Sequence, residues 1–243
     1  MTTSLINPAP RLRSSLILLF GVDLVLGAAY GINFAVGAPW PSFTRNVDLD
    51  AESNAATWYA STLWVLAGLL FLVAVLPRLD RRRISTYLLL LMPAVCLVCS
   101  LDEVAELHEG FANHADRWFL AASRIGTPWS HSGVWVFLLA PVAALLAGAA
   151  IRVLGREFGF GRPGVFLAAL AWAGLLLSGG GAELVSNLTW KLPGPNMIEV
   201  LVEETGENLA VTLLCWAALD LVVASGFSVA WTAPAGRAQL DGG

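Results

Sequence analysis

Six long apolar segments alternate with short polar connections along the chain. They cover residues 15–36, 57–76, 84–101, 133–153, 165–185 and 200–223. Each segment is long enough to cross a hydrocarbon layer of about 30 Å, which takes roughly 20 helical residues. Because backbone polar groups have to be satisfied within the segment in lipid, each span is expected to be helical. The pattern therefore predicts an all-α fold, a polytopic membrane bundle of six transmembrane helices.

Composition supports a membrane protein and sets its domain limits. Of the 243 residues, 57% are hydrophobic and 13% are charged, whereas about 25% are charged in soluble domains. There is no basic face for nucleic acid, so we exclude that class of partner. The first apolar run lacks a small-residue cleavage site and carries Asp23, which favours a retained first span over a signal peptide. We expect one transmembrane domain over residues 15–231, between tails at 1–14 and 232–243.

Most arginines and most acids occupy opposite sets of connections. Most arginines lie before the first span and in the second and fourth connections, and most acids lie in the others. By the positive-inside rule, both termini face the cytoplasm and the acids face outside. We expect a multi-pass protein of a bacterial cytoplasmic (inner) membrane, with lipids as partners and other membrane subunits as further candidates. Tryptophans near the acidic side predict an interfacial belt: Trp40, Trp58, Trp64, Trp118, Trp129, Trp135 and Trp190.

The end of the third span carries an unusual run of acids, SLDEVAELHE at residues 100–109. If the helix continues at about 100° per residue, Asp102, Glu106 and Glu109 share one face, with Glu103 and His108 to either side. This is the helix end at which the macrodipole disfavours negative charge. We therefore expect a positive species, shared protons or a metal ion, to hold these groups together.

The sixth span carries the second half of the predicted site. Glu203 and Glu207 are an i, i+4 pair with Glu204 beside them, too deep in the span to be helix caps. Glu183 follows three consecutive glycines, residues 179–181, at the end of the fifth span. Those glycines indicate either close helix packing or a locally broken helix that lines a polar cavity. Because the third and sixth spans both carry acids that need a shared polar cavity, we expect the two helices to be neighbours.

Two smaller features allow more than one interpretation. Asp48, Asp50, Glu52 and Asn54 alternate as in a hard-cation loop, but the glycine and distal glutamate of an EF-hand are missing. A helix cap from Ser53 or Asn54 to the second span is the favoured reading. Deeper in the membrane, Asp23 in the first span and Asp220 in the sixth are either snorkelling or capping residues, or together the inner station of an ion path.

These blocks together resemble a family of uncharacterised bacterial polytopic membrane proteins. The resemblance implies that the blocks form one site, and it implies no particular reaction. In that family the acidic motif of the sixth span tends to be followed by Leu or Met and then Gly, whereas here Asn208 follows Glu207 and Gly206 precedes it. The matching blocks are DLDAESN at 48–54, ATWYAS at 56–61, SLDE at 100–103, ELHE at 106–109 and EETGE at 203–207.

Better-known metal and hydrolase families fit poorly. Ferritin-like di-iron bundles need Glu-x-x-His on two helices, but Ala105 stands three residues before His108. Zincins need a second His in register, and none follows Glu109. Membrane hydrolases of the alkaline-ceramidase type share the helix count but have a His-x-x-x-His element that is absent here.

Three functions remain open. The first is a divalent metal site. Ca²⁺, Mg²⁺, Mn²⁺ or iron is favoured over zinc because most candidate ligands are oxygens. Such an ion could serve a membrane enzyme that acts on a lipid or periplasmic substrate. In that case Glu103 or Glu204 is the expected general base. The second is a proton- or cation-coupled transporter, and the third is a non-catalytic subunit of a larger complex. The candidate ligands are Asp102, Glu106, His108, Glu109, Glu183, Glu203 and Glu207.

Overall fold

The computed structural model describes residues 9–51, 53–80, 84–107, 110–111, 134–182, 185 and 195–226. The long helices are α1 (Ala9–Ala35), α3 (Ala55–Val75), α4 (Leu91–Ala105), α7 (Val134–Phe158), α8 (Pro163–Leu175) and α10 (Pro195–Ala224), and α2 (Pro41–Val47) is short. Two 3₁₀ segments, η1 (Leu76–Arg78) and η2 (Ile84–Leu90), and one π-helical turn, η3 (Leu176–Gly180), extend them.

The predicted all-α membrane bundle is confirmed. Six helices are long and apolar enough to cross a membrane, and the described part of the chain contains no strand. The third span begins with the 3₁₀ segment η2, and the fifth ends in the π-helical turn η3. The chain is therefore a multi-pass membrane protein by the length and composition of its helices.

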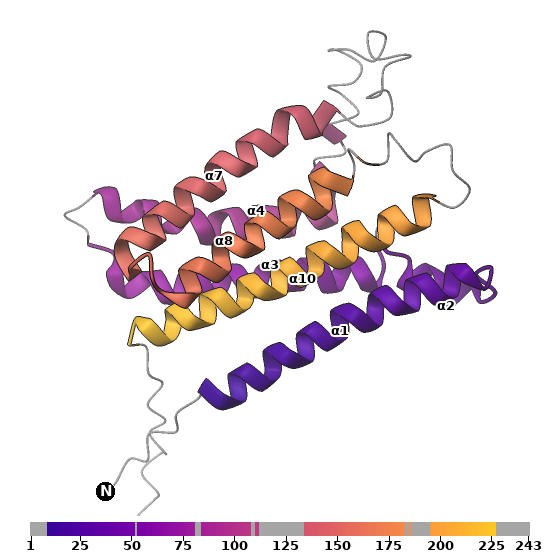
Figure 1. Cartoon of the computed structure of the whole chain (residues 1–243), viewed down its shortest axis with the longest axis horizontal. Coiled ribbons are helices and arrows are strands. Elements are labelled where there is room, and N and C mark those ends of the chain that lie inside the picture. The colour runs from indigo at the N-terminus through magenta and orange to yellow at the C-terminus, as the bar shows by residue number, and fades with distance from the viewer. Residues whose placement is uncertain are drawn as a thin grey trace, which may run out of the picture.

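Helix α10 is the centre of the bundle. It packs against α8, α3 and α1, while α4 packs on α3 and α7 packs on α8. Figure 1 shows α7, α8, α10 and α1 in succession across the front, with α3 and α4 behind them. Leu214, Cys215, Ala217 and Ala218 of α10 are completely buried. The acidic half of this central helix lines the candidate functional site.

Small residues let α10 approach its neighbours closely. A Cβ on Gly206 would lie 2.7 Å from Cβ of Ser178, and one on Gly27 would lie 2.5 Å from Oγ1 of Thr205. Both distances are too short for a real contact, so these glycines are required where the helices meet. Close backbone packing of this kind stabilises membrane bundles, in which the hydrophobic effect between helices is weak.

The connection from α1 to α3 is tied down by side-chain hydrogen bonds. Asn33, 1% exposed, exchanges hydrogen bonds with Thr44 of α2, which fixes α2 against the end of α1. The side chain of Asn54 accepts a hydrogen bond from the backbone N–H of Thr57 at 2.9 Å and donates to the carbonyl of Asp48. The predicted cap of the second span by Asn54 is confirmed.

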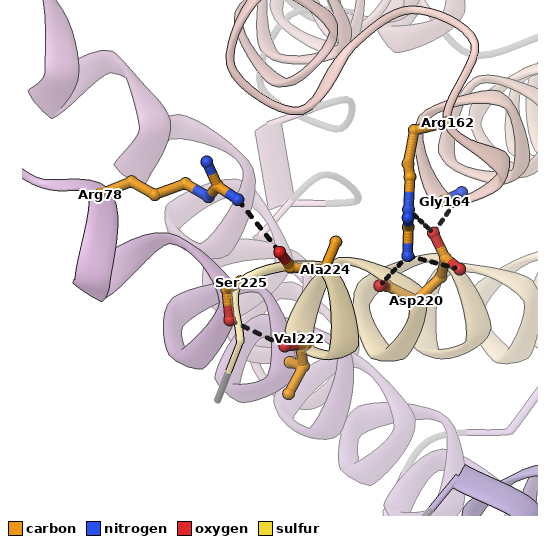
Figure 2. Close-up of polar contacts among 7 residues, drawn as sticks. All are labelled: Arg78, Arg162, Gly164, Asp220, Val222, Ala224 and Ser225. Carbon is orange, nitrogen blue, oxygen red and sulfur yellow. Dashed lines mark hydrogen bonds and ion pairs between the residues drawn. The ribbon is translucent and has the colours of Figure 1, made fainter. Parts of the chain in front are cut away.

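We call the opposite end of the bundle, which carries Arg78 and Arg162, the arginine end. There, Arg162 forms an ion pair of 2.8 Å with Asp220, which also accepts a hydrogen bond from the backbone N–H of Gly164 at the start of α8 (Figure 2). Arg78 donates to the carbonyl of Ala224 at 3.2 Å (Figure 2). Asp220 is thus a structural residue that joins α8 to α10.

One of the tryptophans assigned to the interfacial belt is not at the interface. Trp40 and Trp58 are 63% and 68% exposed, as belt residues would be, but Trp64 is 4% exposed and belongs to the core. The belt prediction is wrong for Trp64 because this residue lies about two and a half turns inside α3, where it contacts Glu103 of α4 and Trp172 of α8. Its indole N–H donates a hydrogen bond to the side chain of Glu103 in α4.

Candidate cation-binding site

An acidic cavity of about 290 Å³ lies between α3, α4, α7, α8, η3 and α10. Acids, two tryptophans and small apolar residues line it. Lys, Arg and His are absent from the lining in the described ranges, so the wall has strong negative character. Its acids are Asp50, Asp102, Glu103, Glu203, Glu204 and Glu207.

Helix α4 supplies Asp102 and Glu103. The indole N–H of Trp64 donates a hydrogen bond of 3.1 Å to Oε1 of Glu103. Nearby, the hydroxyl of Ser61 lies 2.9 Å from that of Ser100 and joins the same two helices. These contacts between α3 and α4 hold the Glu103 carboxylate at the cavity wall.

The expectation of an unbroken helix as far as Glu109 is wrong at Glu106. α4 ends at Ala105, and Glu106 takes a left-handed conformation with φ of 50°, while its N–H still bonds to the carbonyl of Asp102 at 2.8 Å. This reversal takes Glu106 off the face shared with Asp102. Its side chain is exposed and does not line the cavity.

Helix α10 supplies Glu203, Glu204 and Glu207, as the i, i+4 spacing indicated. Glu207 lies close enough to Asp102, Glu103 and Glu203 for their charges to interact. The third and sixth spans therefore share one polar cavity. They reach it from either side of α3, against which both α4 and α10 pack.

The glycines at the end of the fifth span serve both roles considered for them. Residues 176–180 form the π-helical turn η3, and Gly179 and Gly180 line the cavity, as a broken helix would. A Cβ on Gly179 would collide with Oε1 of Glu207, so this glycine also allows close approach. The Glu207 carboxylate is thus seated against the backbone of η3.

The segment before α3 forms part of the cavity rim. Leu49 is 8% exposed and packs with Tyr30 and Ala56, and it lines the cavity together with Asp50. Oδ1 of Asp48 accepts a hydrogen bond from the backbone N–H of Asp50 at 3.3 Å. Burial raises the pKa of the Asp48 carboxyl above its ordinary value.

Sequence reasoning missed three residues of this site: Trp64, Asn208 and Asp50. Trp64 was assigned to the interface, although its depth within the span was a signal of burial. Asn208 is 6% exposed and lines the cavity; a buried amide one position after Glu207 is itself a sign of a polar lining. Asp50 was considered only as a ligand of its own loop.

The predicted metal ligands do not form a ready-made metal site. Among the residues the structure describes, no three His, Cys, Asp or Glu side chains converge closely enough to hold an ion. His108, Glu109 and Glu183 lie outside the described residues. The side chains as they stand therefore do not support metal binding, and a metal ion would have to draw the cavity carboxylates inward.

Asp23 and Asp220 do not form a common inner station. Asp23 accepts a hydrogen bond of 2.6 Å from Tyr59 and is close to Thr212 of α10. Thr212 and Asp220 are eight residues apart on the same helix, roughly 12 Å at 1.5 Å per residue. Asp220 is engaged by Arg162 at the arginine end, so the two acids have separate surroundings.

The fold and the site define a class: a six-span α-helical membrane protein with an acidic cavity near one end of the bundle. The chain belongs to the family of the domain of unknown function DUF8692, whose model matches residues 16–223. That match includes every described residue of the cavity. No curated protein and no solved structure matches the chain.

Proposed function

We propose that the acidic cavity is a cation-binding site. The observation that carries this proposal is the position of Glu207, which is seated against η3 within electrostatic range of Asp102, Glu103 and Glu203. Carboxylates from two helices thus line one cavity. A cavity with walls of one sign concentrates ions of the opposite sign.

A divalent metal ion is the first occupant to test. Carboxylate and amide oxygens favour Ca²⁺, Mg²⁺, Mn²⁺ or iron over zinc. Asp102, Glu203 and Glu207 line the cavity and are the acids we propose as ligands. Glu103 and Glu204 would then remain as bases if the bound ion serves a reaction on a lipid or another substrate.

Proton- or cation-coupled transport is the second candidate. It is favoured by the buried carboxyl of Asp23, 1% exposed, which lies beyond the cavity within the bundle. Ionisable groups inside a membrane protein commonly mark ion paths. A catalytic metal site in the cavity would not need a second buried acid outside it.

The test is elemental analysis of the purified protein with three variants. Wild-type protein should retain a divalent metal after dialysis and release it to a chelator. Glu207→Gln and Glu203→Gln should reduce the bound metal at least tenfold. Glu106→Gln is the matched control, since Glu106 directly follows α4 but does not line the cavity. Metal-free wild-type protein that takes up no ion on addition would contradict the metal form of the proposal.

We also propose that the cavity opens toward the extracytoplasmic side, because most arginines, Arg78 and Arg162 among them, lie at the other end. Single cysteines at the exposed positions Ser53 and Arg156 should react with a membrane-impermeant reagent from opposite sides. Labelling of both from one side would contradict this orientation.

A further inference from the structure

Asp23 is a buried carboxyl group separate from the cavity carboxylates. Its side chain is 1% exposed and lies between α1, α3 and α10. Oδ1 accepts a hydrogen bond from the hydroxyl of Tyr59 at 2.6 Å, and the same hydroxyl lies 3.2 Å from the carbonyl of Leu19. Oδ2 has no hydrogen-bond partner in the part of the chain that the structure describes.

A second buried oxygen without a partner lies beside it. Thr212 is 0% exposed, and within the described residues its Oγ1 makes no hydrogen bond. It is a close polar neighbour of both Asp23 and Tyr59. Cys215, one turn further along α10, is the other ionisable side chain that faces this group. The carboxyl group of Asp23 and the hydroxyl group of Thr212 are therefore buried neighbours, and each has an oxygen without a hydrogen-bond partner within the described residues.

The stretches of α1, α3 and α10 around Asp23 offer no cationic side chain. Residues 14–35, 55–75 and 195–224 contain no Lys, Arg or His. A buried carboxylate needs a counter-charge, because an isolated ion in an apolar interior costs several kcal/mol. The Tyr59 hydroxyl already sits at hydrogen-bond distance from Oδ1, which leaves no room for a metal ion between them.

We infer that Asp23, Tyr59 and Thr212 form a proton-binding site inside the membrane. With the proton on Oδ2, the acid donates to Oγ1 of Thr212 and accepts from Tyr59 at Oδ1. When the proton leaves, the Thr212 hydroxyl turns and donates to Oδ2. Hydroxyl groups donate and accept, so both states are fully hydrogen-bonded. Only one proton is exchanged with water, and no other bond is made or broken.

The acidic cavity is the polar region next to this site along α10. Asn208 lines the cavity and is 6% exposed, and Thr212 follows it by one helical turn on the same face of α10. The acidic end of the bundle is therefore the side from which we expect the proton to enter. The site stands whether or not the cavity binds a metal ion.

The experiment is pH-induced infrared difference spectroscopy of the protein in lipid bilayers, without divalent ions. Wild-type protein should show a carboxylic-acid C=O band that Asp23→Asn removes. Asp220→Asn is the matched control, because Asp220 is the other aspartate of α1, α3 and α10 but is held by Arg162, and it should leave the band in place. Thr212→Val should shift the band frequency, because the acid loses its acceptor. Labelling wild-type aspartate with ¹³C should move the band even if a variant fails to fold.

Three results would overturn the inference. One is a pH difference spectrum that is unchanged by Asp23→Asn in protein whose thermal unfolding is intact. Another is a band that ¹³C-aspartate does not move. The third is a band that responds to Na⁺ at fixed pH, which would make this a metal-ion site. No divalent ion is used, so failure here is distinguishable from failure of the cation-binding proposal.

Discussion

The indole N–H of Trp64 donates a hydrogen bond of 3.1 Å to the carboxylate of Glu103. Trp64 is 4% exposed, and its ring lies 6.2 Å from that of Trp172, centroid to centroid, so its position is fixed by packing. A rigid donor on α3 thus sets the direction of an acid on α4. Through this contact the apolar core of the bundle controls the geometry of the acidic cavity.

Trp64→Phe should destabilise the protein by about 1–3 kcal/mol, because phenylalanine lacks the N–H donor to the Glu103 carboxylate and fills less of the core. Trp58→Phe is the control, since Trp58 is 68% exposed, and it should change stability by less than about 0.5 kcal/mol. Thermal unfolding in detergent measures both. Equal effects would show that the indole N–H contributes nothing at Glu103.

Gly179→Ala should destabilise by about 1–3 kcal/mol, because the new methyl group collides with the Glu207 carboxylate. Gly181→Ala is the matched control within the same glycine run: in the described part of the chain, the atom nearest to its new Cβ would be the carbonyl oxygen of Leu176, 4.0 Å away, and alanine favours a helix by about 1 kcal/mol. Adding Glu207→Ala to Gly179→Ala should recover part of the loss. If the two glycine variants unfold at the same temperature, Glu207 does not sit against η3.

Asp220→Asn should cost about 1–3 kcal/mol, since it weakens both the 2.8 Å ion pair with Arg162 and the acceptor for the N–H of Gly164. Glu157→Gln removes the longer, more exposed 3.5 Å pair with Arg78 and should cost less than about 0.5 kcal/mol. Chemical or thermal unfolding compares them. Asp220→Asn should also leave cation binding unchanged. A loss of binding would indicate that Asp220 takes part in an ion path.

Asp48 should make stability depend on pH. Burial raises the pKa of this carboxyl in the folded protein, so the folded state binds the proton more readily than the unfolded state. Its contribution is therefore fully present below the unfolded pKa and is lost as pH rises through the folded pKa. Asp48→Asn should raise Tm relative to wild type at neutral pH and lose that advantage in acid. A Tm difference between Asp48→Asn and wild type that does not change with pH would contradict this account.

The bundle could be predicted from the sequence because apolar segments of about 20 residues have few alternatives in lipid. The pairing of acids from the third and sixth spans was also predictable, since buried carboxylates at i, i+4 spacing need a shared polar space. The cap at Asn54 followed from local chemistry alone, because a side-chain oxygen before a helix has a defined backbone partner.

Three details could not be predicted because tertiary packing decides them. Helix periodicity cannot show that α4 reverses at Glu106, since a left-handed glutamate carries no composition signal. The burial of Trp64 depends on which face of α3 meets α4. Similarly, Asp23 and Asp220 looked equivalent in the sequence, and only their neighbours, Tyr59 and Arg162, separate them.

The most direct test of the central claim is thermal unfolding of purified protein at neutral pH, first with a chelator and then with Ca²⁺, Mn²⁺ or Fe²⁺ restored. A ligand that binds only the folded state stabilises it by about 2.7 kcal/mol at one hundred times its Kd. We predict that at least one ion raises Tm by several degrees in wild type and in Glu106→Gln, and that Glu207→Gln abolishes the shift. The effect should weaken as acid protonates the ligands. An unchanged midpoint with every ion, or an equal shift in Glu207→Gln, would contradict a divalent-cation site in the acidic cavity.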